Sequence, residues 1–346
     1  MGILLKILEI GGIAFVAILA SVSAAIYFSG PRLPEDIDET LDRVLLLDLP
    51  EFLKGETGYV RSGNTEVWYE SIGNNASTKG AIVLFMGIAN DALGWPQGFI
   101  DRLVDSGYRV IRYDYRGTGM SDWMPDWKEA PYALADLAGD AKRILDKLNV
   151  ERAHLVGVSM GGMVAQEFAI DFPRRALTLT SIMSSGNILD ENIKAISKKI
   201  TFGLIKIAIK YGLFPTERRL IKMVVAARVL LRGDADYRID VKGTAQQVLY
   251  NLRKRKGFNR HASAQHQEAV RRSGSRYERL KDLKLPSLVI HGKNDPFVPI
   301  EHSQKLASVL PDAKTSWVSN MGHDLPPSLY DTLITSMIDH FKSNPN

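Results

Sequence analysis

A serine between glycines is the first group in this sequence that could do chemistry. It lies at the centre of Gly157-Val158-Ser159-Met160-Gly161, a G-x-S-x-G pentapeptide. An apolar run at 154–158 is predicted as a strand, and the run at 163–171 is predicted as a helix. A strand, a tight turn and a helix hold a serine exposed, and glycines let that turn close without side-chain clashes. We therefore predict that Ser159 is a nucleophile.

A serine hydroxyl is a weak nucleophile at neutral pH and needs a neighbouring base. His323 follows the last predicted strand, and Asp295 follows the strand before it. Because reactive groups gather at the carboxyl ends of parallel strands, these side chains should meet Ser159 at one edge of a sheet. The sequence thus predicts a catalytic triad of Ser159, Asp295 and His323, in that chain order.

The tetrahedral intermediate of acyl transfer needs hydrogen-bond donors for its oxyanion. We assign the first to the backbone N–H of Met160, which directly follows the nucleophile. The second is assigned to the backbone N–H of Ile88, after the predicted strand 81–85, where Gly87 lets the chain pass close by. The chain has no cysteine, which excludes thiol nucleophiles, disulfides and Cys-ligated zinc. No metal and no cofactor are predicted, and no substrate-binding residue is assigned.

The elements that must position these groups alternate along the chain. Strands are predicted at 66–70, 81–85, 109–114, 154–158, 177–183, 287–291 and 314–318, and amphipathic helices at 99–106, 133–148 and 163–171. This alternation predicts an α/β fold with a mostly parallel central sheet flanked by helices. The stretch at 188–280 is helical throughout in its pattern, and we interpret it as an all-helical cap inserted over the site.

The predicted cap is strongly basic. Residues 190–280 include 21 Lys and Arg against 8 Asp and Glu, although the whole chain has a formal charge of only +5. A solvated helical surface accounts for this excess, and so does a surface that faces anionic lipid headgroups. Nucleic acid is not a predicted partner, because the basic residues carry no recognisable binding motif.

The first thirty residues differ from the rest. Nineteen residues without a charge, 10–28, form an apolar run that would span roughly 28 Å as a helix. Lys6 precedes the run and acidic residues follow it, which predicts a single-pass N-terminal transmembrane helix with the catalytic domain on the non-cytoplasmic side. A cleaved signal peptide and a buried core helix stay open as alternatives.

These observations predict five segments along the chain. They are a membrane anchor at 1–30, a tether at 31–55 with a short helix around 39–47, the first part of the core at 56–187, the cap at 188–280 and the second part of the core at 281–346.

The motifs, in this order, resemble those of the α/β-hydrolase superfamily over about residues 56–346. More narrowly, the chain resembles the esterase branch that includes aclacinomycin methylesterase. The matching stretches are Met86-Gly87 with Trp95-Pro96, Val110 to Asp114, Gly157 to Gly162, and Gly322-His323 with Leu325-Pro326. The resemblance implies an α/β-hydrolase fold, the Ser159–Asp295–His323 triad and ester hydrolysis through an acyl-enzyme.

The chain departs from the family pattern in two places. Many members have His-Gly where this sequence has Met86-Gly87, so the oxyanion assignment rests on the backbone. The apolar N-terminal segment and the basic cap are not part of the esterase pattern, so the natural ester is not implied. Asp114 and Arg116 are similar to a common loop of the superfamily, and we expect them to support that loop rather than to act in catalysis.

The leading hypothesis is a membrane-tethered serine hydrolase that cleaves lipophilic carboxylic esters, which are either small molecules or lipids. The same triad could instead serve thioester hydrolysis, acyl transfer, carbon–carbon hydrolysis or perhydrolysis. A third interpretation is a non-catalytic membrane-bound scaffold on the same fold. The sequence does not predict the oligomeric state.

Overall fold

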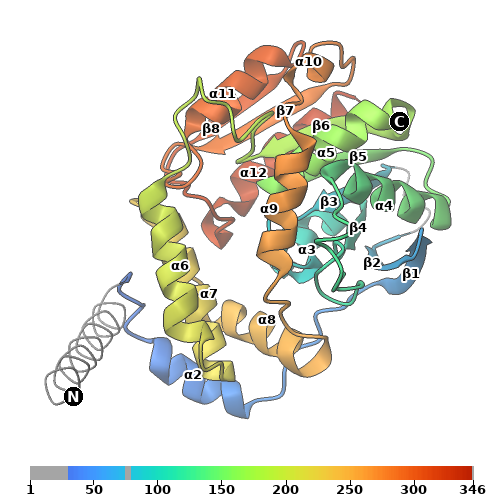
Figure 1. The fold of residues 1–346 in the computed structure, drawn as a ribbon. Coiled ribbons are helices and arrows are strands. Elements are labelled where there is room, and N and C mark those ends of the chain that lie inside the picture. The colour runs from blue at the N-terminus through green and yellow to red at the C-terminus, as the bar shows by residue number, and fades with distance from the viewer. Residues whose placement is uncertain (1–29, 75–78, 345–346) are drawn as a thin grey trace, which may run out of the picture.

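The computed structural model describes residues 30–74 and 79–344, and its centre is a twisted β-sheet (Figure 1). Within the described residues the sheet has eight strands in the order β1-β2-β4-β3-β5-β6-β7-β8. Their bounds are β1 Glu56–Ser62, β2 Thr65–Ile72, β3 Ala81–Phe85, β4 Arg109–Tyr113, β5 Ala153–Val158, β6 Ala176–Ile182, β7 Ser287–Gly292 and β8 Lys314–Val318. The pairs β1–β2 and β2–β4 are antiparallel and all other pairs are parallel. The predicted mostly parallel sheet is confirmed.

The central strands are apolar runs because helices cover both of their faces. Every residue of β3, β5 and β6 is buried. The edge strand β1 was not predicted from the sequence, since most of its residues are exposed and it lacks such a run. It forms a hairpin with β2 through Gly63-Asn64, and Gly63 has a φ of 63°. A Gly-Asn pair between two extended runs is a hairpin signal that could have revealed it.

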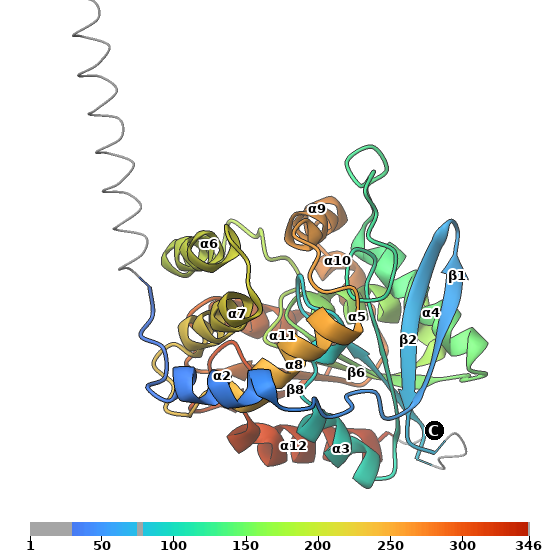
Figure 2. The ribbon, with the colours of Figure 1, turned by 90° about the horizontal axis from the view of Figure 1, so that it is seen from below.

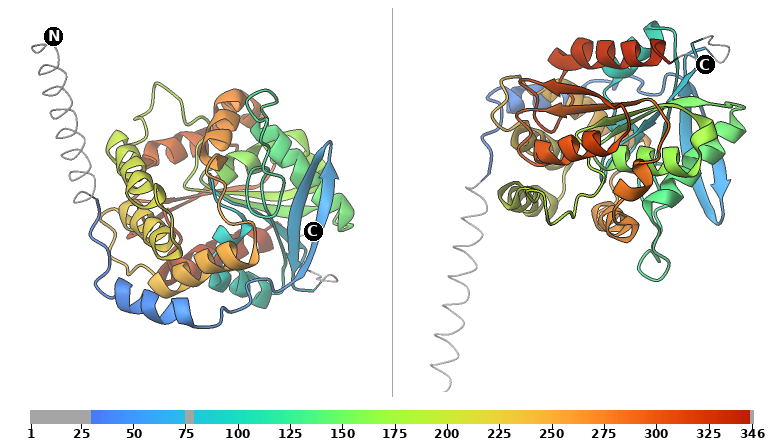
Figure 3. Two further views of the ribbon diagram at one scale, coloured as in Figure 1. Left: turned by 60° about the horizontal axis from the view of Figure 1, so that its bottom comes forward. Right: turned by 90° about the horizontal axis from the view of Figure 1, so that it is seen from above.

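Helices pack on both faces of the sheet. Helices α3 (Gln97–Asp105) and α12 (Tyr330–Lys342) cover one face, and their apolar residues form one core with β4, β5 and β7. Helices α4 (Leu134–Lys147), α5 (Met160–Asp171) and α11 (Ile300–Val309) cover the other face and form the second core. The right-hand view of Figure 3 shows the sheet between the red α12 and the orange α11. This arrangement places the carboxyl ends of the parallel strands along one edge.

The chain between β6 and β7 is built from helices. Their bounds are α6 Lys198–Gly212, α7 Glu217–Arg232, α8 Val241–Lys254, α9 Ala262–Ser273 and α10 Tyr277–Leu280. Helices α6 and α7 pack side by side, α7 also contacts α8, and α9 contacts α4 of the core (Figure 1). The bounds of the predicted cap, 188–280, stay a prediction.

The segment that precedes β1 carries helix α2 (Ile37–Leu46), close to the short helix predicted around 39–47. Its buried side chains, Ile37, Leu41 and Val44, form a third apolar cluster with α7 and α8. Arg218 of α7 also pairs with Asp38 of α2 at 2.8 Å. Figure 2 shows α2 alongside α8. Helix α2, within the segment predicted as a tether at 31–55, is thus packed against the helical segment between β6 and β7.

The membrane localisation predicted from the sequence is wrong. Among residues 30–74 and 79–344, no helix is long and apolar enough to cross a bilayer. A span needs about 20 apolar residues, whereas α7, with 16 residues, is interrupted by Arg and Lys. The predicted anchor at 1–30 rested on the run 10–28, which lies outside the described residues. We therefore withdraw the single-pass anchor, the non-cytoplasmic placement of the catalytic domain and the membrane as a partner.

Candidate active site

Ser159 lies in a sharp turn between β5 and α5. Its backbone has φ 55° and ψ −122°, and its N–H donates to the carbonyl of Ile182 at 2.8 Å. A Cβ atom on Gly157 would lie 2.2 Å from the Gly161 carbonyl oxygen, and one on Gly161 would lie 2.0 Å from the Phe85 carbonyl oxygen. The turn can close only with glycine at both positions, so the pentapeptide is a steric requirement of the elbow.

The imidazole of His323 lies between Ser159 and Asp295. Its Nε2 is 3.1 Å from the Ser159 Oγ, and its Nδ1 is 2.7 Å from the Asp295 Oδ2. With the carboxylate accepting from Nδ1–H, the neutral ring leaves Nε2 free to accept the serine proton. The fold thus brings together three side chains that the sequence placed on separate loops.

Asp295 is fully buried and held by backbone donors. Its Oδ1 accepts from the amides of Phe297 and Val298, each at 2.9 Å. Burial by itself would raise the pKa of this carboxyl, but the adjacent His323 ring and the donated hydrogen bonds hold that pKa below its ordinary value. The carboxylate is therefore ionised at neutral pH and can orient the imidazole.

The loop that carries His323 is fastened to helix α7. The N–H of His323 donates to the carbonyl of Leu231 near the end of α7 at 2.8 Å. Asn320 donates through its side chain to the Asp236 carbonyl at 2.9 Å, and its N–H donates to the Asn294 side chain at 3.0 Å. The helical segment between β6 and β7 thus fixes the position of the imidazole.

The two amides assigned to the oxyanion hole lie beside the serine. Met160 is the first residue of α5, where a backbone N–H has no partner within the helix. Ile88 follows Gly87, and a Cβ on Gly87 would lie 3.5 Å from the Ser159 Cβ. Within the described residues, neither amide is recorded as donating a hydrogen bond to the protein. The assignment of both amides to the oxyanion hole stays a prediction.

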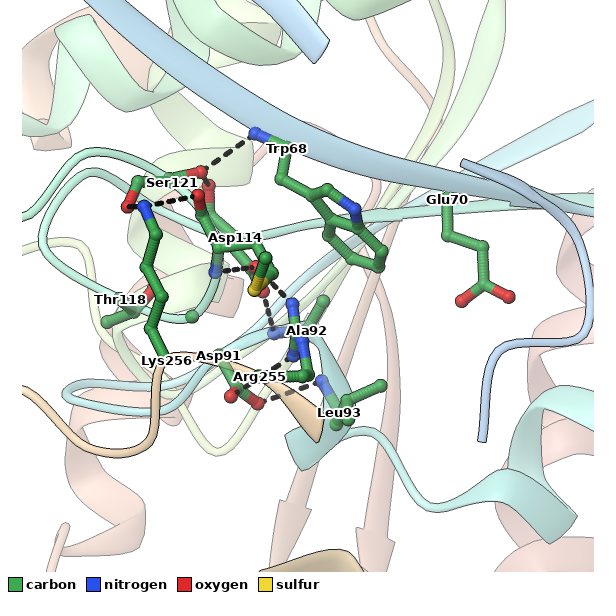
Figure 4. A network of polar contacts seen from close by, with 12 residues as sticks. Trp68, Glu70, Asp91, Ala92, Leu93, Asp114, Thr118, Ser121, Arg255 and Lys256 are labelled. Atoms are coloured by element: carbon green, nitrogen blue, oxygen red, sulfur yellow. Dashed lines mark hydrogen bonds and ion pairs between the residues drawn. The ribbon is translucent and has the colours of Figure 1, made fainter. Parts of the chain in front are cut away.

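Asp114 directly follows β4 and supports two loops. Its carboxylate accepts from the amides of Ala92 and Met120 at 2.8 and 2.7 Å, and it pairs with Arg255 from the helical segment (Figure 4). Arg116 instead pairs with Asp140 of α4 at 2.7 Å. These contacts agree with the expected supporting roles of Asp114 and Arg116.

Three buried residues near the site were not singled out from the sequence. Arg255 follows α8, His266 lies within α9 and His291 is the penultimate residue of β7. His291 lies with its Nε2 3.4 Å from the Asp295 carboxylate, but that nitrogen donates to the Val298 carbonyl at 3.0 Å. His291 could have been found from the sequence, because it lies four residues before the predicted triad residue Asp295. Nothing local in the sequence marks Arg255 or His266.

The chain is similar to proteins of known fold. The profile of the alpha/beta hydrolase fold family matches residues 80–326. The rhodomycin D methylesterase DauP of Streptomyces sp. (strain C5) is 30% identical over 312 residues, which cover 83% of this chain and 98% of that protein. The 2-hydroxy-6-oxo-6-phenylhexa-2,4-dienoate hydrolase of Comamonas testosteroni is 31% identical over 72% of this chain and 83% of that protein.

Solved structures agree on the architecture. The esterase EaEST from Exiguobacterium antarcticum superimposes with a TM-score of 0.65 at 19% identity, over 82% of this chain and 98% of that one. At this identity the likeness concerns the fold alone.

Proposed function

Because this chain belongs to the α/β-hydrolase family and is a carboxylic ester hydrolase of its esterase branch, we propose that Ser159, His323 and Asp295 are its catalytic triad. The observation that carries the proposal is the pair of contacts made by His323, 3.1 Å to Ser159 and 2.7 Å to Asp295. Both distances lie within hydrogen-bond reach, which is the geometry that serine activation requires.

The proposed reaction passes through an acyl-enzyme. The Ser159 Oγ attacks the ester carbonyl while the His323 Nε2 takes the hydroxyl proton, and the amides of Met160 and Ile88 donate to the oxyanion. When the intermediate collapses, the alcohol leaves with that proton. Water then attacks the acyl carbon while His323 takes its proton. The bond from the acyl carbon to the Ser159 Oγ breaks, His323 returns the proton to the serine, and the acid leaves. Asp295 stabilises the charged imidazolium throughout.

We further propose that the ester is lipophilic and reaches the serine beneath a helical cap at 188–280. Apolar groups adjoin the triad, which supports this substrate class. The Phe297 ring lies edge-on to the His323 ring with centroids 5.3 Å apart, and Met160 is buried beside the nucleophile. Since the relative DauP is named a methylesterase, methyl esters of bulky acids are the first substrates to test.

The test compares two serine variants of the full chain on a panel of methyl and p-nitrophenyl esters. Ser159→Ala should abolish both turnover and labelling by a fluorophosphonate probe. Ser308→Ala, which changes an exposed serine on α11, should leave both unchanged. Ester turnover that persists in Ser159→Ala would refute the triad.

Carbon–carbon hydrolysis is the second candidate, favoured by the relative from Comamonas testosteroni. The two reactions are separated by assaying the purified chain with 2-hydroxy-6-oxo-6-phenylhexa-2,4-dienoate and with a methyl ester. We expect kcat/KM to be higher for the ester. A higher value for the dienoate would favour the second candidate while leaving the triad in place.

A further inference from the structure

Helix α9, which belongs to the helical segment between β6 and β7, contacts the loop that follows β3. His266 of α9 is fully buried, and its Nδ1 accepts from the N–H of Ala89 at 3.0 Å. The other ring nitrogen, Nε2, donates to the carbonyl of Arg116 at 3.2 Å. The ring therefore joins the loops that follow β3 and β4 through one neutral tautomer.

The ring is confined as well as hydrogen-bonded. Tyr115 packs edge-on against it with ring centroids 5.6 Å apart, and Tyr132 lies 6.3 Å away. Burial lowers the pKa of His266 to about 4, so the ring is neutral at neutral pH and its Nδ1 stays an acceptor. A charged imidazole would carry a proton on Nδ1 and could not accept the Ala89 hydrogen bond.

The residue held by His266 is in a strained conformation. Ala89 has a φ of 61°, in the left-handed region that a residue with a Cβ seldom adopts. Such strain persists only where surrounding contacts hold it. The Ala89 N–H belongs to the peptide that joins it to Ile88, so holding this peptide fixes the carbonyl side of Ile88 and restricts the orientation of the Ile88 N–H one residue back. The amide of Ile88 is the second donor of the proposed oxyanion hole.

The far end of the same loop is fastened separately. Asp91 accepts from the Leu93 N–H at 3.0 Å and pairs with Arg255 at 3.2 Å, as Figure 4 shows. Ala92 donates to Asp114. These contacts lie beyond Ala89. The peptide between Ile88 and Ala89 has two other hydrogen bonds: the Asn90 side chain donates to its carbonyl at 3.0 Å, and its N–H donates to His266 of α9.

We propose that His266 is a positioning residue, which holds the loop 86–90 so that the Ile88 amide faces the oxyanion and which makes catalysis depend on the docking of α9. This inference rests on the proposed function, because it concerns the rate of the Ser159 reaction. Docking of α9 would then assemble the oxyanion hole, while α7 holds His323 through Leu231.

Two conservative variants separate the two hydrogen bonds of the ring. An asparagine amide oxygen can take the place of Nδ1 and still accept from Ala89, whereas a glutamine amide nitrogen can take the place of Nε2 and donate to Arg116. His266→Asn should keep kcat within about fivefold of the wild-type value. His266→Gln and His266→Ala should lower kcat by about 10- to 100-fold with KM changed by less than about threefold, because the loss concerns the transition state.

Gln267→Ala is the matched control. Gln267 is exposed on the same helix, and its side chain donates to Ser263 within α9 at 3.0 Å. This variant leaves the docking contacts of α9 in place and should keep its kcat. Equal losses in His266→Asn and His266→Gln, or a comparable loss in Gln267→Ala, would overturn the proposal.

A second measurement reads the loop independently of turnover. Amide hydrogen exchange of a peptide that contains residues 86–91 should be faster in His266→Gln than in the wild-type chain and unchanged in His266→Asn. A wild-type chain that does not turn over esters would refute the proposed function. The exchange experiment would still test whether His266 positions the loop. Unchanged exchange in His266→Gln would refute the positioning role even in an active enzyme.

Discussion

The guanidinium of Arg255 and the carboxylate of Asp114 form an ion pair in which the two side chains are only 2% and 0% exposed. Arg255 comes from the helical segment and Asp114 from the end of β4, 141 residues apart in the sequence. The same guanidinium pairs with Asp91 at 3.2 Å and lies over the Trp68 ring at 4.5 Å. One arginine thus joins the helical segment to two loops at the active-site edge.

Arg255→Met should destabilise the protein strongly. The change leaves two buried carboxylates without their cation, and breaking a buried pair in this way costs about 3–5 kcal/mol. The free energy of unfolding in urea measures the loss. Arg43→Met is the matched control, because Arg43 pairs with Glu39 on the exposed face of α2 and such pairs contribute about 0.5 kcal/mol or less. Equal losses of unfolding free energy in the two variants would contradict the proposed contribution of Arg255 to stability.

Asp295→Asn should lower kcat by about three to four powers of ten with a small effect on stability. The amide no longer holds the His323 Nδ1–H in the orientation that leaves Nε2 free to accept a proton. Steady-state kinetics on the best ester of the panel measures the loss. Asp282→Asn, at an exposed position, serves as the control. A loss of less than tenfold in Asp295→Asn would argue against its place in the triad.

Two glycine-to-alanine changes should act in opposite directions. In Gly161→Ala the new Cβ would lie 2.0 Å from the Phe85 carbonyl oxygen, so the elbow must distort and activity should be lost. In Gly139→Ala, within α4, no atom lies within 4 Å of the new Cβ. Alanine there should stabilise the helix by about 0.5–1 kcal/mol. Thermal unfolding together with ester turnover compares the two variants.

The stability of the protein should fall in acid partly because of His154. Burial and the nearby His340 lower the pKa of His154 to about 4, below the ordinary 6.5. The unfolded chain therefore binds this proton more tightly, so stability is fully present above about pH 6.5 and is lost as the pH falls towards 4. The difference amounts to at most about 3 kcal/mol.

His154→Phe should reduce this dependence on pH. Phenylalanine preserves the stack on Phe341, whose ring centroid lies 4.2 Å from that of His154, but it cannot take up a proton. Denaturant unfolding at pH 7 and at pH 4.5 measures the change. Thr178→Val, which removes the hydroxyl 3.0 Å from the His154 Nδ1, retains the titrating ring and should retain the dependence. If the free energy of unfolding of His154→Phe changes with pH as much as that of the wild-type chain, His154 is excluded as the source of the acid sensitivity.

Much of this fold could be predicted from the sequence, because each central strand is a short run of apolar residues that can be recognised locally. The predicted strands 81–85 and 314–318 coincide with β3 and β8, and the chain order of Ser159, Asp295 and His323 placed each residue after a strand of the sheet. Buried strands must be apolar and tight turns must hold glycine, and both requirements act over a few residues. The edge strand β1 escaped because its exposed residues carry no such requirement.

The prediction of a membrane localisation was wrong because it also relied on a local pattern alone. A run of uncharged residues at 10–28 satisfies a local rule of length and hydropathy, but that rule does not determine what surrounds the run. Within the described residues no helix could span a bilayer. Hydropathy alone was an insufficient basis for the prediction.

The sequence by itself determined the strands β2 to β8 and the glycine-flanked turn at Ser159, and it predicted the triad proposed above, since local patterns encode these features. Only the tertiary structure decided which parts of the helical segment hold the active site. His266 meets Ala89 across 177 residues, and Arg255 meets Asp114 across 141. A histidine within a helix and an arginine after one carry no local mark of such a role. Their partners are chosen by how separate elements pack, which becomes visible only when the chain is folded.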